Sequence, residues 1–185
     1  MRRLWLTGYR SYELGVFNDE DPKLTIINYS LKKHLQAELD DGLEWLITGA
    51  QLGTEQWGVR VAHALKPDYP EFKTAVMLPF TDFGSQWKEK NQQQLQSILQ
   101  LADFHSFVYQ APYQNPQQLR QYQQFMLSHT DGALLLYDPE QSGKADYDYH
   151  AIQQFQQQHD YPLTLIDLYE LQDDAENYAE AHDPQ

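Results

Sequence analysis

Short apolar segments alternate regularly with longer segments of helical periodicity along this chain, and this alternation restricts its fold more than any other feature. We expect strands at residues 4–7, 45–48, 73–78, 104–109, 132–137 and 163–166, and helices near residues 25–39, 54–65, 87–101 and 144–159, with a further helix that begins at Pro116. Unbroken apolar strands that are joined by helices predict a parallel sheet covered on both faces. Because such crossovers are right-handed, the sequence predicts a Rossmann-like α/β fold, with a doubly wound, mainly parallel sheet and helices on both faces.

The organisation along the chain indicates a single domain. No internal repeat or linker divides residues 1–168, and the most apolar run, residues 133–136, is expected to form the central strand. After Leu168 the chain is acidic and contains no Lys or Arg. For residues 169–185 we therefore expect a frayed helix or a disordered tail.

Composition excludes several classes of function. The chain has no cysteine, which excludes disulfides, thiolate metal sites and a cysteine nucleophile. Its net charge of −14 argues against binding to nucleic acid, which requires a basic surface. A small phosphate-bearing ligand remains compatible with this charge, because backbone amides at helix N-termini can hold an anion. No segment is long and apolar enough to span a membrane, so we expect a cytoplasmic protein.

Three loops after strands stand out, because ligands of open α/β sheets bind at the carboxyl ends of the strands. They are residues 7–10, 48–55 and 137–144. The loop 48–55 gives the strongest signal, since Gly49 and Gly53 would let the backbone approach a ligand closely. It matches neither a Walker A loop nor a dinucleotide-binding fingerprint. A tight turn, whose glycines only satisfy backbone geometry, is an equal alternative.

Candidate side chains at these loops have structural alternatives. Glu55 lies in a first helical turn, where it either interacts with the helix dipole or binds a hydroxyl or amine of a ligand. Trp57 is either a stacking partner for a base or a buried packing residue. The run at residues 146–150 contains two Asp and one His, but residues two apart on a helix diverge. Solvated helix positions are therefore expected there, and neither a metal nor a cofactor is predicted.

Four segments together resemble the YpsA family of the SLOG superfamily. They are residues 6–10 with 13–15, then 49–57, 78–80 and 130–138, and the resemblance extends over nearly the whole chain to about Leu168. It implies a nucleotide-derived ligand, such as a nucleotide, ADP-ribose or a nucleotide-sugar, and a link to bacterial cell division. No biochemical activity is implied.

The chain is similar, more distantly, to the Lonely Guy phosphoribohydrolases of the same superfamily, which cleave the N-glycosidic bond of nucleoside monophosphates. Their phosphate loop corresponds to residues 137–148, where Gly143 matches one of three glycines and Lys144 follows it. Asp146 stands where a catalytic glutamate would be. Arg120 lies about two positions too early to match the catalytic arginine, so this resemblance implies hydrolysis only weakly.

The leading hypothesis is therefore a sensor that binds a nucleotide-like ligand and is read by a protein partner. The alternatives are a phosphoribohydrolase-like enzyme, with Glu55 or Asp146 as catalytic candidates, and an interaction module with a vestigial pocket. A homo-oligomer is compatible with all three. The residues expected to bind the ligand are Gly8, Tyr9, Arg10, Gly49, Gln51, Gly53, Glu55, Trp57, Pro79, Phe80, Asp138, Gly143 and Lys144.

Overall fold

Within residues 1–183, which the computed structural model describes, six parallel strands form one sheet in the order β4-β3-β2-β1-β5-β6. The strands are β1 (Arg3–Gly8), β2 (Trp45–Thr48), β3 (Lys73–Leu78), β4 (Phe104–Phe107), β5 (Gly132–Leu136) and β6 (Leu163–Ile166). All neighbouring pairs are parallel, as the regular alternation predicted. The doubly wound α/β fold is therefore confirmed.

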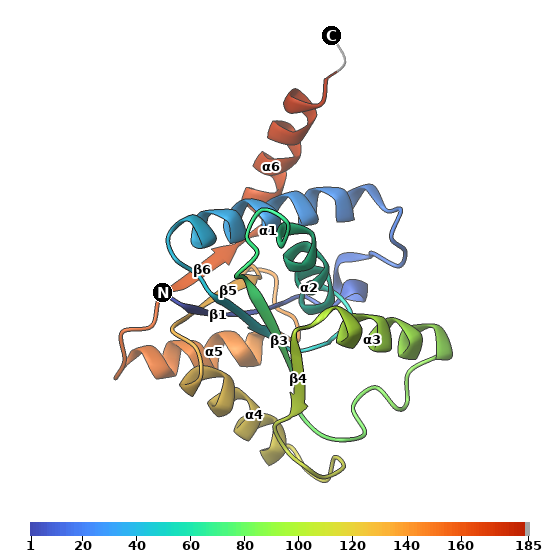
Figure 1. The fold of residues 1–185 in the computed structure, drawn as a ribbon, viewed down its shortest axis with the longest axis vertical. Coiled ribbons are helices and arrows are strands. Elements are labelled where there is room, and N and C mark those ends of the chain that lie inside the picture. Colours follow the sequence, from blue (N-terminus) through green and yellow to red (C-terminus); the bar gives the residue numbers. More distant parts are fainter. Residues whose placement is uncertain (184–185) are drawn as a thin grey trace.

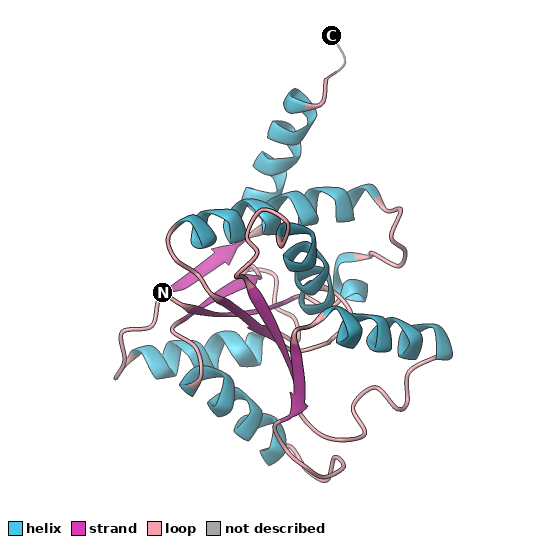
Figure 2. Ribbon diagram, viewed as in Figure 1, coloured by secondary structure: helices cyan, strands magenta, loops and turns pink. Residues whose placement is uncertain are grey.

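Helices cover both faces of the sheet (Figures 1 and 2). They are α1 (Pro22–Asp40), α2 (Thr54–Leu65), α3 (Glu89–Leu101), α4 (Gln117–Ser128), α5 (Asp146–Gln156) and α6 (Leu168–Ala181), with a short 3-10 helix, η1, at Ser11–Leu14. Figure 1 shows α1 and α2 on one side of the sheet and α4 and α5 on the opposite side. Helix α3 contacts α2, and α4 contacts α5.

Local sequence signals explain where the helices begin. Asp21 caps α1 by accepting a hydrogen bond of 2.9 Å from the Lys23 amide, and Pro22 takes the first helical position. Helix α1 therefore starts three residues before the apolar periodicity that predicted it. Pro116, expected at a first helical position, instead precedes the first residue of α4 as its N-cap.

The strand expected at the centre of the sheet lies nearer its edge. Strands β1 and β2 occupy the middle, whereas β5 lies between β1 and the edge strand β6. Every residue of β5 is nevertheless buried. Burial on both faces makes a strand apolar whether or not it is central, so hydrophobicity could not give the strand order.

The acidic segment after Leu168 forms helix α6, which contacts α1. Buried Asp174 accepts hydrogen bonds from Ser30 Oγ at 2.5 Å and from Lys33 Nζ at 2.6 Å. Towards its C-terminal end α6 extends away from the rest of the chain (Figure 1). Residues 184–185 of the predicted tail lie outside the described residues. Between residues 1 and 183 no helix is long and apolar enough to cross a bilayer.

Candidate functional site

The candidate site is a cavity of about 560 Å³ at the carboxyl ends of β1, β2 and β3. The strand order reverses between β1 and β5, which is where open α/β sheets bind their ligands. The loops after both strands reach the cavity, and α4 and α5 complete its wall. Among the residues predicted from sequence, those that line it are Arg10, Gly49, Gln51, Glu55, Pro79 and Lys144.

Glu55 is fixed in the floor of this cavity. Its side chain belongs to the first turn of α2, and the residue is 5% exposed. One carboxylate oxygen accepts from the Gln51 amide at 2.9 Å, and the other accepts from Thr7 Oγ1 at 2.8 Å. Both oxygens are thus engaged by the protein, although each retains a lone pair that a ligand could use.

A second carboxylate, Asp148 from the first turn of α5, faces the same cavity. It accepts from Gln123 Nε2 at 2.8 Å, and its other oxygen lies 3.3 Å from Thr7 Oγ1. A hydroxyl has one hydrogen, and the shorter contact with Glu55 uses it, so Thr7 cannot fully satisfy both carboxylates. Burial, with the negative charge of Glu55 adding to it, raises the pKa of Asp148 from 3.8 to about 6.

The phenol of Tyr122 lies beside these carboxylates. Its hydroxyl donates to the carbonyl of Met77 at 3.0 Å, and burial raises its pKa well above the ordinary value. Tyr122 therefore stays neutral and serves as a fixed polar edge of the cavity.

Three cationic side chains line the same cavity, namely Arg10, Arg120 and Lys144. Arg10 donates to the carbonyl of Gly8 at 3.2 Å, and within residues 1–183 none of the three forms a salt bridge. Arg120 and Lys144 are exposed and are the last two Lys or Arg residues of a chain with net charge −14. Positive charge is therefore available to an anionic group entering this cavity.

Aromatic rings form a further part of the wall. Phe83, Tyr113 and Tyr147 line the cavity. Tyr113 is 44% and Tyr147 is 74% exposed. Exposed rings beside a polar floor offer stacking surfaces for a planar group.

Some of the predicted residues support the loop after β5 rather than line the cavity. The Tyr9 hydroxyl donates to the Gln141 carbonyl at 2.6 Å and accepts from the Asp138 amide at 3.0 Å. The Asp138 carboxylate accepts from the amides of Glu140 and Leu168. Gly143 lies against the carboxylate of Glu13.

Other predicted residues pack against neighbouring parts of the protein. Gly8 lies against the backbone of Leu136, and Gly53 lies against the backbone of residues 9–11. Trp57 is buried in the core at 5% exposed. The ring of Phe80 contacts the ring of Tyr113 with centroids 5.0 Å apart.

Asp146 and Asp148 point to different partners, as their spacing on a helix predicted. Asp146 accepts from the Tyr137 hydroxyl at 2.5 Å and lies 3.4 Å from the His150 ring. Asp148, expected to be solvated, instead reaches the cavity floor. Throughout the described part of the chain, no three His, Asp or Glu side chains are grouped so as to hold a metal.

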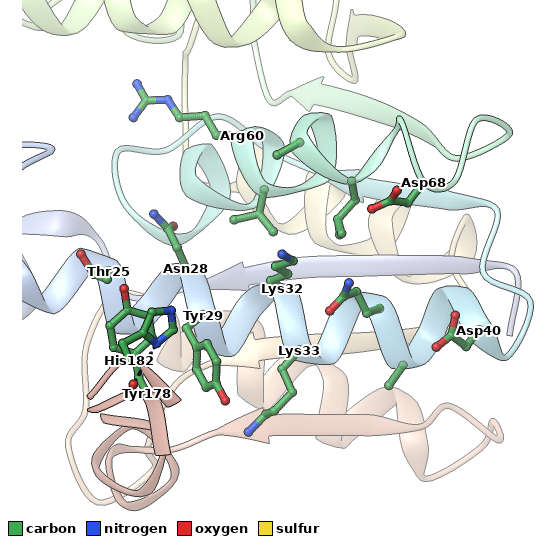
Figure 3. A pocket seen from close by; sticks show the side chains of 15 residues that line it. Thr25, Asn28, Tyr29, Lys32, Lys33, Asp40, Arg60, Asp68, Tyr178 and His182 are labelled. Carbon is green, nitrogen blue, oxygen red and sulfur yellow. Dashed lines mark hydrogen bonds between the residues drawn. The ribbon is translucent and has the colours of Figure 1, made fainter. Parts of the chain in front are cut away.

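A larger and more open hollow, of about 810 Å³, lies between α1 and α2 with α6 at one end (Figure 3). It is lined by residues of mixed charge, including Lys32, Asp40 and Asp68. Lys33, which also lines it, is already paired with Glu170 and Asp174 of α6. This hollow lies on a helical face, away from the loops at the strand ends, and is therefore not the candidate site.

Comparison with known proteins shows the family of the chain. A sequence profile of YpsA, described as the YspA SLOG family, matches residues 4–171. The chain belongs to this family. The chain is 63% identical over 180 residues to a UPF0398 protein of Latilactobacillus sakei subsp. sakei (strain 23K), covering 97% of both chains. It is 57% identical to a UPF0398 protein of Levilactobacillus brevis, covering 97% of this chain and 95% of the relative.

Several residues of the candidate site were not predicted. Asp148, Tyr122, Gln123 and Tyr113 come from α4, α5 and the loop before α4, which contain no glycine motif. One signal was available for Asp148. The first turn of a helix that follows a buried strand lies at the carboxyl edge of the sheet, and of two acids in that turn one can face the ligand crevice.

Proposed function

We propose that this protein binds a small nucleotide-derived ligand that carries a phosphate and free hydroxyl groups. The observation that carries the proposal is the composition of the cavity. Three cationic residues, Arg10, Arg120 and Lys144, line it together with the carboxylates of Glu55 and Asp148. Arginine and lysine hold phosphate through charge-assisted hydrogen bonds. Buried carboxylates accept from hydroxyls, such as those of a ribose, and the exposed rings of Tyr113 and Tyr147 offer stacking surfaces for a base.

The charges also argue for an orientation of the ligand. A phosphate beside Glu55 or Asp148 would meet like charge, whereas at Arg120 and Lys144 it meets charges without partners in the described structure. The phosphate therefore belongs at the cationic side, with the hydroxyls towards the floor. A protein partner that reads the bound state, and the link to cell division, belong to the same proposal.

A thermal-shift screen of AMP, NAD⁺, ADP-ribose and UDP-sugars tests this function. A ligand at 100 times its Kd should stabilise the protein by about 2.7 kcal/mol. The double variant Arg120→Gln/Lys144→Gln is the control for location, because binding at this cavity should be lost in it. A screen in which no compound stabilises the wild-type protein contradicts the proposal.

The pKa of Asp148 favours a second candidate function, hydrolysis of an N-glycosidic bond. A carboxyl group that titrates near pH 6 can exchange protons with a leaving base or with water. In this reaction water adds to C1′ of the ribose, the bond from C1′ to the base breaks, and the base leaves with a proton. Glu55 would stabilise the positive charge that develops on the sugar.

Chromatography of AMP after incubation with the protein separates the two functions. An enzyme releases adenine, and both Glu55→Gln and Asp148→Asn abolish the release. Because Asp146 accepts a hydrogen bond from Tyr137 outside the cavity, Asp146→Asn is the matched control and should keep the activity. Binding of AMP without release of adenine favours the sensor.

A further inference from the structure

Glu13 connects the two loops that carry cationic residues of the candidate site. It lies in η1, and one of its carboxylate oxygens accepts from the Arg10 amide at 2.7 Å. The other accepts from the Lys144 amide at 2.9 Å. One carboxylate thus joins the loop after β1 to the loop after β5, across a separation of 131 residues in the sequence.

Gly143 leaves the space that this carboxylate occupies. A β-carbon on Gly143 would overlap Oε2 of Glu13 and would lie 3.3 Å from the ring of Tyr9. Glycine is therefore required at position 143 for a reason that involves no ligand. A side chain there would push the Glu13 carboxylate away from the Lys144 amide.

Glu13 engages the backbone of both residues and leaves their charges free. Within residues 1–183 its carboxylate forms no salt bridge with the guanidinium of Arg10 or the ammonium of Lys144. Had it paired with either cation, it would have neutralised charge that a phosphate needs. Bonds to the two amides hold the backbone in place without this cost.

We propose that Glu13 is a positioning residue, which clamps the loops after β1 and β5 together and so holds Arg10 and Lys144 at the ligand. This inference rests on the proposed function for its consequence in binding, whereas the clamp itself is independent of any ligand. A glutamine at this position has one acceptor oxygen for two amide donors, so Glu13→Gln must lose one of the two bonds.

Amide hydrogen exchange, measured by two-dimensional NMR without ligand, tests the clamp. In Glu13→Gln we expect the amide of Arg10 or of Lys144 to exchange at least about tenfold faster. Glu140→Gln is the matched control. It also removes one negative charge, but from an exposed side chain in the loop after β5, which carries Lys144. Wild-type exchange of both amides in Glu13→Gln overturns the inference.

Titration with AMP as the probe tests the consequence. The Kd for AMP should rise about tenfold in Glu13→Gln, remain at the wild-type value in Glu140→Gln and recover in part in Glu13→Asp, which restores two acceptor oxygens. Faster exchange with an unchanged Kd overturns the positioning role. If the wild-type protein does not bind AMP, the proposed function fails for this nucleotide, and the exchange rates alone decide the inference.

Discussion

The carboxylate of Glu55 lies directly against Gly49, in the space that a side chain at Gly49 would need. A β-carbon there would overlap Oε1 of Glu55 and would lie 2.7 Å from the hydroxyl of Tyr122. The flexible end of a glutamate could normally move aside, but this one is held by Thr7 and by the Gln51 amide. The glycine therefore allows a carboxylate to sit over the loop after β2.

Replacing Gly49 by alanine should displace Glu55 and weaken ligand binding. Because a lost hydrogen bond to a charged group costs about 1.5–3 kcal/mol, we expect the Kd of the best compound in the screen to rise roughly 10- to 100-fold. Titration calorimetry measures this change, and Glu55→Gln in the Gly49→Ala background should add little further loss. Independent, additive effects of the two substitutions would contradict the shared mechanism.

Gly53 should behave differently, because its backbone requires glycine. Its φ is +121°, and a β-carbon would lie 2.5 Å from the Ser11 amide nitrogen and 2.6 Å from the Tyr9 carbonyl oxygen. Gly42 has a φ of +103° but nothing within 4 Å, so it serves as the control for strain alone. In urea unfolding we expect Gly42→Ala to cost about 1 kcal/mol and Gly53→Ala roughly 2–5 kcal/mol. Equal losses in the two variants would show that the contacts of Gly53 do not matter.

Asp148 should make stability depend on pH between about 4 and 6. Its pKa is raised in the folded protein, so the folded state binds a proton that the unfolded state releases at lower pH. The free energy of unfolding should therefore fall as the pH rises through this window, by up to about 1.4 kcal/mol for each pH unit. Asp148→Asn should lose this contribution, while Asp146→Asn keeps it.

The measurement is the difference in unfolding free energy between the wild type and each variant at pH 4, 5, 6 and 7. The charged groups that face Asp148 are Glu55, which raises its pKa, and Arg10, which lowers it. A flat difference between wild type and Asp148→Asn over this range would show that the carboxyl group titrates at its ordinary pKa.

The sequence predicted the fold because the same local pattern, an apolar strand followed by a segment of helical periodicity, repeats along the chain. Helix α2 was predicted with the bounds it has, since Gly53 and Pro67 enclose a clear periodicity. The strand order was not predictable from hydrophobicity, because β1, β2 and β5 are all buried on both faces.

The candidate site could be predicted where loops carry glycine or charge, as at Gly49, Glu55 and Lys144. It was missed where helices contribute single side chains. Gln123 looks like an ordinary residue of a solvated helix, and only the position of Asp148 in a first helical turn at the sheet edge could have pointed to it. The glycines of these loops also have different structural roles, which the sequence did not distinguish. Gly49 makes room for Glu55, whereas Gly143 makes room for Glu13 and Gly53 satisfies its own backbone.

Arg120 and Lys144 give the sharpest test of where a phosphate binds. Both side chains are exposed, so Arg120→Gln and Lys144→Gln should change the melting temperature little. Each should raise the Kd of a phosphate-bearing ligand roughly tenfold or more, because each removes a charge-assisted hydrogen bond. Lys32→Gln is the matched control, since it removes a charge from the hollow between α1 and α2 instead.

The same variants can be titrated with a nucleoside and with its monophosphate. If the cations bind the phosphate, both substitutions raise the Kd of the monophosphate and leave the Kd of the nucleoside, which binds more weakly, unchanged. If the Kd values of the two compounds rise equally, the cations act on the shape of the cavity rather than on the anion. A loss of binding in Lys32→Gln together with wild-type affinity in the other two variants would move the ligand to the hollow between α1 and α2.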